Sequence, residues 1–219
     1  MKNVRIWFKK DDECRFISHL DLNRCMLRAL HKSGIPIWHT EGFNTHPYAT
    51  FPLPLSLGFR GEKECMDVRL IEEYRFDDIK TNLNKCLPLG IRIFDVTEAE
   101  MKAKDISFAK FKIKISCDEV SNDTLLKYTE ELFTKNEILV EKKTKKKGLK
   151  EVDIKPYLDN VKYERNIGGV YIYVVLPAGS VTNINPLLIQ KAFEKYYNID
   201  VYFDVTKTDM YDKNLKTFK

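Results

Sequence analysis

The sequence predicts an α+β protein made of two tandem ferredoxin-like β-α-β-β-α-β units with antiparallel sheets. Strand and helix patterns follow one another in this order in the first half of the chain, and the same order returns in the second half. A polar segment with little apolar periodicity, residues 98–107, separates the two halves. The length of 219 residues suits two small domains. We therefore expect one domain over residues 1–100 and a second over residues 106–219.

The first half begins with an alternating, aromatic-rich segment at residues 4–8, which predicts a strand. Ser18 is a good N-cap for the helix that follows, Asp21 stands three residues later, and Gly34 is typical of a helix end. Between them, apolar residues recur at the spacing of one helical face. The remaining patterns of this half predict strands at residues 35–39, 64–71 and 91–97 and a helix at residues 76–86.

The second half begins with a clean alternation over residues 108–116, which predicts a strand. A helical period follows over residues 122–135. Pro186 suits the first position of a second helix, and Asn185 suits its N-cap. The remaining patterns predict strands at residues 138–143, 170–176 and 201–205, with the second helix at residues 186–197.

Composition excludes several classes of protein. The hydrophobic fraction of 43% is enough for a packed core and excludes wholesale disorder. No apolar run approaches the length of a membrane span, and the early charges predict that there is no signal peptide. The five cysteines form no CxxC pair, so we expect a cytoplasmic protein with reduced thiols and no zinc or iron–sulfur centre. Because the sequence has no phosphate-loop motif, we also expect no cofactor.

The residues best suited to a functional site lie in the first 60 positions. The N-terminus of a helix presents unpaired N–H groups and a partial positive charge, which attract phosphate or carboxylate. The segment GFNTHP, residues 42–47, is an extended loop whose polar side chains can point at a ligand. The candidate substrate-binding residues are Arg15, Ser18, Asn23, Arg24, Arg28 and Asn44.

Two histidines are the candidate catalytic residues if the protein is an enzyme. His19 lies in the first turn of the first helix, and His46 lies in the GFNTHP segment. They would serve as general base and general acid. The alternative role for His19 is a structural hydrogen bond or a contact with the helix dipole. No pair of histidines has the tight spacing of metal ligands on one element, so we expect no metal site.

A lysine-rich segment, residues 141–151, falls between two predicted strands and is expected to form a β-hairpin arm or a mobile loop. Its side chains could follow the phosphate backbone of a nucleic acid. The alternative is a solvated loop that aids solubility. The candidate nucleic-acid-binding residues are Lys142, Lys143, Lys145, Lys146, Lys147 and Lys150.

Aromatic residues on the predicted strands offer another route to nucleic acid, because bases stack on aromatic side chains of an open sheet face. The sheets also need large side chains in their cores, and this second interpretation is the favoured one. The residues concerned are Trp7, Phe8, Phe111, Tyr171 and Tyr173.

A specific run of motifs occupies residues 15–58, where the chain reads RFISHLDLNR, then RAL, then GFNTHP and PLPLSLG. The run resembles the signature of the radical SAM-linked protein family, a bacterial family of unknown function. Further matches are ECMD at residues 64–67 and KEVDIKPYL at residues 150–158. Thr45 replaces a usual Pro, and Tyr48 replaces a common Lys, so a cation that could meet a phosphate is missing.

The resemblance implies that the partner is a radical SAM protein on a separate chain, since this chain lacks cluster-binding cysteines. Three hypotheses follow. The chain is an accessory protein that binds RNA and presents it to that enzyme, a histidine-dependent endoribonuclease, or a pure protein-interaction module. The second draws on an analogy of fold with CRISPR repeat-processing endoribonucleases. It requires His19 and His46 to reach the same phosphate.

Overall fold

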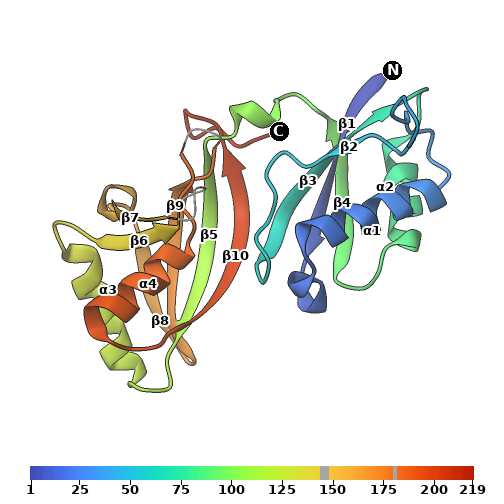
Figure 1. Cartoon of the computed structure of the whole chain (residues 1–219). Coiled ribbons are helices and arrows are strands. Elements are labelled where there is room, and N and C mark those ends of the chain that lie inside the picture. The colour runs from blue at the N-terminus through green and yellow to red at the C-terminus, as the bar shows by residue number, and fades with distance from the viewer. Residues whose placement is uncertain (144–147, 180–181) are drawn as a thin grey trace. The chain divides into compact units, whose positions relative to one another are not determined.

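The structure is a computed structural model that describes residues 1–143, 148–179 and 182–219. It has the predicted α+β fold with mostly antiparallel strands (Figure 1). Contacts divide the chain into two compact units. The first unit holds Met1–Ile106 together with Lys207–Lys219, and the second holds Ser107–Thr206. The predicted second domain thus differs from the second unit at its C-terminal end, because the last residues pack with the first unit.

The first unit is built around its first strand. This strand, β1, pairs antiparallel with β3 on one side and with β4 on the other. The short strand β2 also pairs with β3. The elements of this unit, before the chain leaves it, are β1 (Lys2–Lys10), α1 (His19–Lys32), β2 (Ala49–Thr50), β3 (Arg60–Leu70), α2 (Phe76–Cys86) and β4 (Ile91–Glu98), with short 3-10 turns η1 (Asp12–Phe16) and η2 (Ala103–Asp105).

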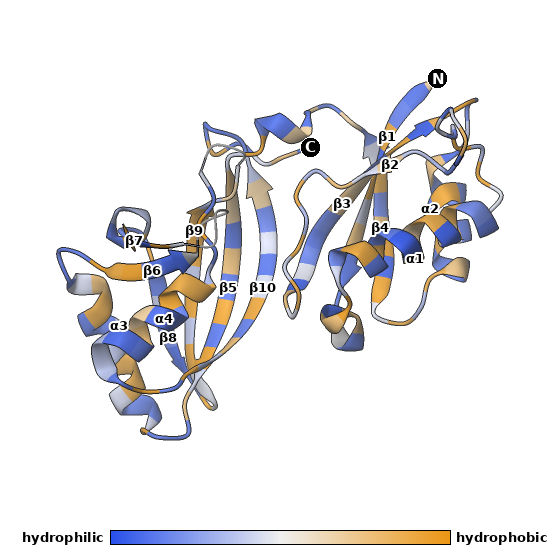
Figure 2. Cartoon of the chain, viewed as in Figure 1, coloured by the Kyte–Doolittle hydropathy of each residue, from blue (hydrophilic) through white to orange (hydrophobic). Residues whose placement is uncertain are grey.

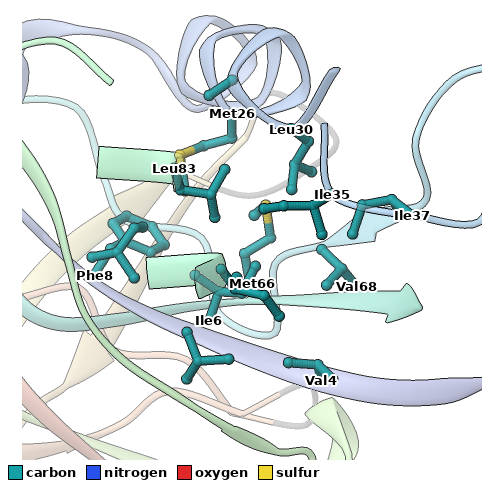
Figure 3. Packing of buried hydrophobic residues seen from close by; sticks show 14 of the residues in the cluster. Val4, Ile6, Phe8, Met26, Leu30, Ile35, Ile37, Met66, Val68 and Leu83 are labelled. Atoms are coloured by element: carbon teal, nitrogen blue, oxygen red, sulfur yellow. The ribbon is translucent and has the colours of Figure 1, made fainter. Parts of the chain in front are cut away.

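Helix α1 forms as the sequence predicts. The Ser18 hydroxyl accepts a hydrogen bond from the Asp21 backbone N–H at 3.2 Å, which satisfies one of the free donors of the first turn. The apolar face of the helix packs on the sheet, and Figure 3 shows Met26 and Leu30 of α1 pointing toward Met66 on β3. This burial of apolar side chains stabilises the unit and fixes which face of α1 meets solvent.

The predicted strand at residues 35–39 is wrong. Only isolated bridges occur there, from Ile37 to Leu70 and from His39 to Pro47. Pro36 has no backbone N–H, and the N–H of Ile37 donates to the Ile35 carbonyl at 2.8 Å. Because these groups are unavailable for a ladder, the segment cannot continue as a paired strand.

The second unit has the strand order β10-β5-β9-β8, which is compatible with a ferredoxin-like arrangement. Strands β6 and β7 pair with each other, so the described ends of the lysine-rich segment belong to a β-hairpin, which is one of the two forms expected for it. Neither β7 nor β8 is among the strands predicted from the sequence. The elements are β5 (Phe108–Ser116), α3 (Asn122–Thr134), β6 (Leu139–Lys143), β7 (Leu149–Asp153), η3 (Lys155–Tyr157), β8 (Lys162–Asn166), β9 (Gly169–Pro177), α4 (Leu187–Tyr197) and β10 (Tyr202–Tyr211).

Strand β5 shows why this sheet has one buried face. Hydrophilic and hydrophobic residues alternate along it (Figure 2), and every second residue is buried. Successive side chains of a strand point to opposite faces, so one face of β5 joins the core and the other does not. Ile113 and Ile115 on the buried face are fully inaccessible.

We predict that Gly169→Ala destabilises the second unit. Gly169 has φ 137°, and a Cβ there would overlap the backbone oxygen of Ile115. A strained backbone of this kind costs about 1–3 kcal/mol. The free energy of unfolding measured with urea should fall by about that amount.

The neighbouring Gly168→Ala is the matched control. A Cβ at Gly168 would meet only the Lys114 ammonium, the far end of a flexible side chain that can move aside. Its unfolding free energy should stay within about 0.5 kcal/mol of the unmodified protein. Equal losses in the two variants would contradict the role given to Gly169.

Candidate functional site

A group of buried charged side chains lies beneath the motif-bearing segments of the first unit. The Lys207 ammonium pairs with the Glu64 carboxylate at 2.9 Å and donates to the Leu53 carbonyl at 3.2 Å. Both charged side chains are almost completely inaccessible. Gly61 leaves the room that the Glu64 side chain occupies, since a Cβ there would collide with it. Burial raises the pKa of Glu64, and Lys207 and Lys10 act against that rise.

Lys10 is the second buried cation of this group. Its ammonium donates to the carbonyl of Arg15 at 3.3 Å and to that of Ile17 at 3.1 Å. These bonds hold the segment that leads into α1. Burial lowers the pKa of Lys10, while the nearby Glu64 and Cys14 oppose this change.

Arg15 connects two motifs of the candidate site. Its Nε donates to the Gly58 carbonyl at 2.8 Å, and the Gly58 N–H donates to the Arg15 carbonyl at 2.9 Å. The side chain is only 6% exposed. Arg15 therefore fastens the segment before α1 to the segment at residues 50–59, and its Nε is committed to a backbone oxygen.

The N-terminus of α1 is already compensated by its own residues. Ser18 caps it, and the Asp21 carboxylate accepts from the Ser18 hydroxyl at 2.7 Å and from Arg24 at 3.3 Å. A carboxylate in the first turn offsets the positive end of the helix. An anionic ligand would meet this negative charge at the helix start.

His19 packs against an aromatic ring. Its imidazole lies edge-on to Phe51, with ring centroids 5.1 Å apart, and its buried Nδ1 has no hydrogen-bond partner among the described residues. Burial, and secondarily Lys10, lowers the pKa of His19, so the folded protein holds it neutral at neutral pH. As the pH falls below the ordinary histidine pKa, His19 becomes protonated in the unfolded chain before it does in the folded protein. Folding is therefore less favourable at these lower pH values.

His46 is exposed at a different end of the sheet. Its Nδ1 lies 3.2 Å from the Thr40 hydroxyl and 3.1 Å from the carbonyl of Asn44, whose side chain is also exposed. Just before this loop, the Trp38 N–H donates to the Arg69 carbonyl of β3. Arg69 is paired with Asn3 at the start of β1, so the loop is anchored at that end of the sheet.

The structure does not bring His19 and His46 together. His19 lies near Lys10, the last residue of β1, whereas the loop of His46 is anchored beside the start of that strand. Asn3 and Lys10 are seven positions apart on the strand, a distance of about 23 Å. Among the described residues, His19 packs on Phe51 and His46 bonds to Thr40 and Asn44, and neither imidazole contacts the other. An acid and a base at one phosphate must both lie within hydrogen-bond reach of it.

A basic groove of about 690 Å³ lies along α1, where Cys86 at the end of α2 joins its lining. Arg24, Arg28 and Lys32 are spaced four residues apart and share one side of the helix. Asp21 is the acidic residue of the lining, and Cys86 brings the end of α2 to it. Of the predicted substrate-binding residues, Arg24 and Arg28 therefore line one groove. The half-buried Asn23 does not line it.

The predicted lysines of the hairpin are distributed differently. Lys142 donates to the Asn183 carbonyl at 2.7 Å, and Lys150 is exposed opposite it on β7. Lys145, Lys146 and Lys147 lie outside the described residues, as does the side chain of Lys143.

The sequence interpretation missed a set of exposed apolar side chains in the motifs. Phe16, Leu20 and Leu57 are 66%, 57% and 61% exposed. The hydrogen bonds between Arg15 and Gly58 bring the backbone that carries Phe16 next to the backbone that carries Leu57. The sequence could have revealed Leu20, because this apolar residue does not fall on the helical face formed by the buried residues of α1.

Among the residues that the structure describes, no group of three or more histidine, cysteine or acidic residues could hold a metal ion. None of the described helices is both long and apolar enough to span a membrane.

The chain belongs to the family described as "Uncharacterized protein conserved in bacteria (DUF2344)", whose model matches residues 3–186. A comparison with curated proteins gave no match. A solved structure, "Crystal Structure of a Cbf5-Nop10-Gar1 Complex", contains a chain of similar fold with TM-score 0.50 and 10% identity. The match covers 94% of this chain and 48% of that one, so this chain spans about half the length of its neighbour. At this identity the likeness concerns the fold alone.

We predict that Lys10→Met loosens the segment before α1. It would remove the buried ammonium that donates to the Ile17 carbonyl, while the Arg15 carbonyl would keep the Gly58 N–H as a donor. An unsatisfied buried group costs about 1–3 kcal/mol. The free energy of unfolding should fall by about 2 kcal/mol or more.

Lys9→Met is the matched control, because Lys9 is exposed on the same strand. Its unfolding free energy should change by less than about 0.5 kcal/mol. As a second readout, Lys10→Met should raise the pKa of His19 in an NMR titration, since the neighbouring positive charge is gone. An unchanged histidine titration and an unchanged stability would contradict the assigned contacts.

Proposed function

We propose that this member of the family is an accessory protein that binds RNA and works with a separate radical SAM enzyme. The observation that carries the proposal is the basic groove beside α1. The radical SAM partner is supported by the motif resemblance at residues 15–58.

The groove suits a phosphate backbone. Arg24, Arg28 and Lys32 form a row about 12 Å long on one side of α1, and His31 adds a further polar nitrogen. Arginine presents a planar set of donors that matches two phosphate oxygens at once. Asp21 pairs with Arg24 at 3.3 Å, but both side chains are exposed, so this weak pair leaves Arg24 able to bind a phosphate together with Arg28 and Lys32.

The exposed apolar side chains of the motifs suit a protein partner. The bonds between Arg15 and Gly58 hold the backbone of the exposed Phe16 beside that of the exposed Leu57, and Leu20 lies in the first turn of the helix that follows Phe16. Exposed apolar side chains gathered in this way are typical of protein–protein contacts. We assign this surface to the enzyme and the groove to the RNA.

The RNA part is tested with Arg24→Glu and Arg28→Glu combined in one variant. Binding of bacterial RNA is measured at about 50 and 200 mM salt, because neutralised phosphates make affinity fall with salt. The variant should bind about tenfold or more weakly at low salt, and its salt slope should be smaller by about 1.4, which corresponds to two lost contacts.

Lys80→Glu combined with Arg92→Glu is the control, because it reverses two exposed charges of the same unit away from the groove lining. The control should lose less affinity and keep the steeper slope. Failure of the unmodified protein to bind RNA at low salt would refute the RNA-binding function.

The partner is tested with Leu57→Glu. A charge on this exposed position should prevent capture of the co-produced radical SAM enzyme of the same bacterium, detected by the visible absorbance of its iron–sulfur cluster. Leu89→Glu, at a residue that is 97% exposed, is the matched control and should leave capture intact. Capture that is equal for both variants would contradict the assigned surface.

A further inference from the structure

The sheet of the second unit has a face that its helices do not cover. Residues 109, 111, 113 and 115 of β5 are buried, so Lys110, Lys112 and Lys114 lie on the other face. Helix α3 contacts β8 and β9 and supplies the buried Leu125 and Leu132. The lysines therefore form a row on the face that points away from the core.

Strand β9 places two tyrosines beside this row. In the antiparallel register, Tyr171 lies opposite Lys114 and Tyr173 lies opposite Lys112. Directly opposed residues point to the same face of a sheet. Both tyrosines are partly exposed, whereas Ile172 between them is fully buried. These tyrosines are thus surface residues of the sheet and do not belong to its core.

A lysine ammonium and a carboxylate hold the two tyrosine rings in place. The Lys112 ammonium lies over Tyr171 at 4.6 Å from the ring centroid and over Tyr173 at 5.9 Å. The Tyr173 hydroxyl donates to the Glu164 carboxylate at 2.7 Å. That hydrogen bond is the main cause that raises the pKa of Tyr173 to about 12, so the ring stays a neutral phenol.

The charges on this face favour an anionic partner. Lys162 pairs with Tyr173 across β8 and joins the three lysines of β5. Among the strand residues that the structure describes, the acidic side chains on the same face are those of Glu164 on β8 and Asp204 on β10, whose neighbours Phe203 and Val205 are buried. Four lysines therefore stand against two carboxylates, and one of these carboxylates is engaged by a tyrosine hydroxyl.

We propose that this face binds single-stranded RNA, with bases stacked on Tyr171 and Tyr173 and phosphates held by the lysines. An aromatic ring accepts the flat face of any base, and nearby cations follow the backbone. The two tyrosines are two positions apart on one strand, about 6.6 Å, so each can receive its own base. An arriving base displaces the Lys112 ammonium from the rings, and the ammonium then meets a phosphate.

A duplex cannot use this platform, because its base faces are already stacked on one another. The assignment rests on the proposed RNA binding and adds a second site to it, in a different unit and with a stated form of RNA. The site has no selectivity for a particular base, since no side-chain amide or arginine is needed for its contacts.

The experiment compares two double variants. Tyr171→Leu with Tyr173→Leu keeps apolar bulk and removes the ring faces, whereas Tyr171→Phe with Tyr173→Phe keeps the ring faces and removes the hydroxyls. The probe is a fluorescein-labelled oligoadenylate of about 12 nucleotides, used alone and as a duplex with its uridylate complement. Affinity is measured by fluorescence anisotropy, and circular dichroism establishes that each variant is folded.

The leucine variant should bind the single strand about tenfold or more weakly, and the phenylalanine variant should bind it about as well as the unmodified protein. The salt slope should stay unchanged in the leucine variant, because the phosphate contacts remain. Lys112→Gln combined with Lys114→Gln should lower that slope, and it provides a second reading if the leucine variant does not fold. Preferred binding of the duplex, or equal binding by the leucine and phenylalanine variants, would overturn the assignment.

The two proposals fail in different ways. If the unmodified protein binds no RNA, the proposed function falls and this site falls with it. The other case is that the unmodified protein binds RNA, that the Arg24 and Arg28 variant binds it more weakly, and that the leucine variant binds it normally. That result refutes the tyrosine face alone.

Discussion

Glu64 lies inside the first unit, where a carboxylate needs a cation beside it. Lys207 supplies that cation from the far end of the sequence, and its ammonium also holds the Leu53 carbonyl. Removing one partner of a buried ion pair leaves the other charge uncompensated, which is strongly destabilising. The pair therefore ties β3, the segment at residues 50–59 and the C-terminal residues to one another, and the motif surface depends on it.

The local parts of this fold could be predicted because local chemistry determines them. Ser18 caps α1, and the alternation of β5 sets its buried face. The strand expected at residues 35–39 failed because Pro36 removes a donor within it. Residues 207–219 belong to the first unit because Lys207 pairs with Glu64. The periodicity of the sequence gives no information about a contact between residues so far apart in the chain.

The candidate site was predictable in its residues and less so in its arrangement. His19, Arg24 and Arg28 were recognisable from the motif, but the separation of His19 from His46 follows from how β1 and β3 pair. The sequence favours a core position for Tyr171 and Tyr173, because a sheet needs large side chains in its core. Val170, Ile172 and Val174 of that strand are buried on one face, whereas Tyr171, Tyr173 and Val175 lie on the other, and only the three-dimensional sheet shows which face joins the core.

The two proposed RNA contacts lie in different units, and this has consequences for affinity. The chain passes between the units twice, once near residue 106 and again near residue 206, so the two surfaces are always covalently joined. Two weak sites joined in one chain that engage the same strand bind it far more tightly than either does alone. Neither the groove nor the tyrosine face needs to be a strong site. A groove with few arginines and a platform with two rings suit a protein that holds a strand and later releases it to an enzyme.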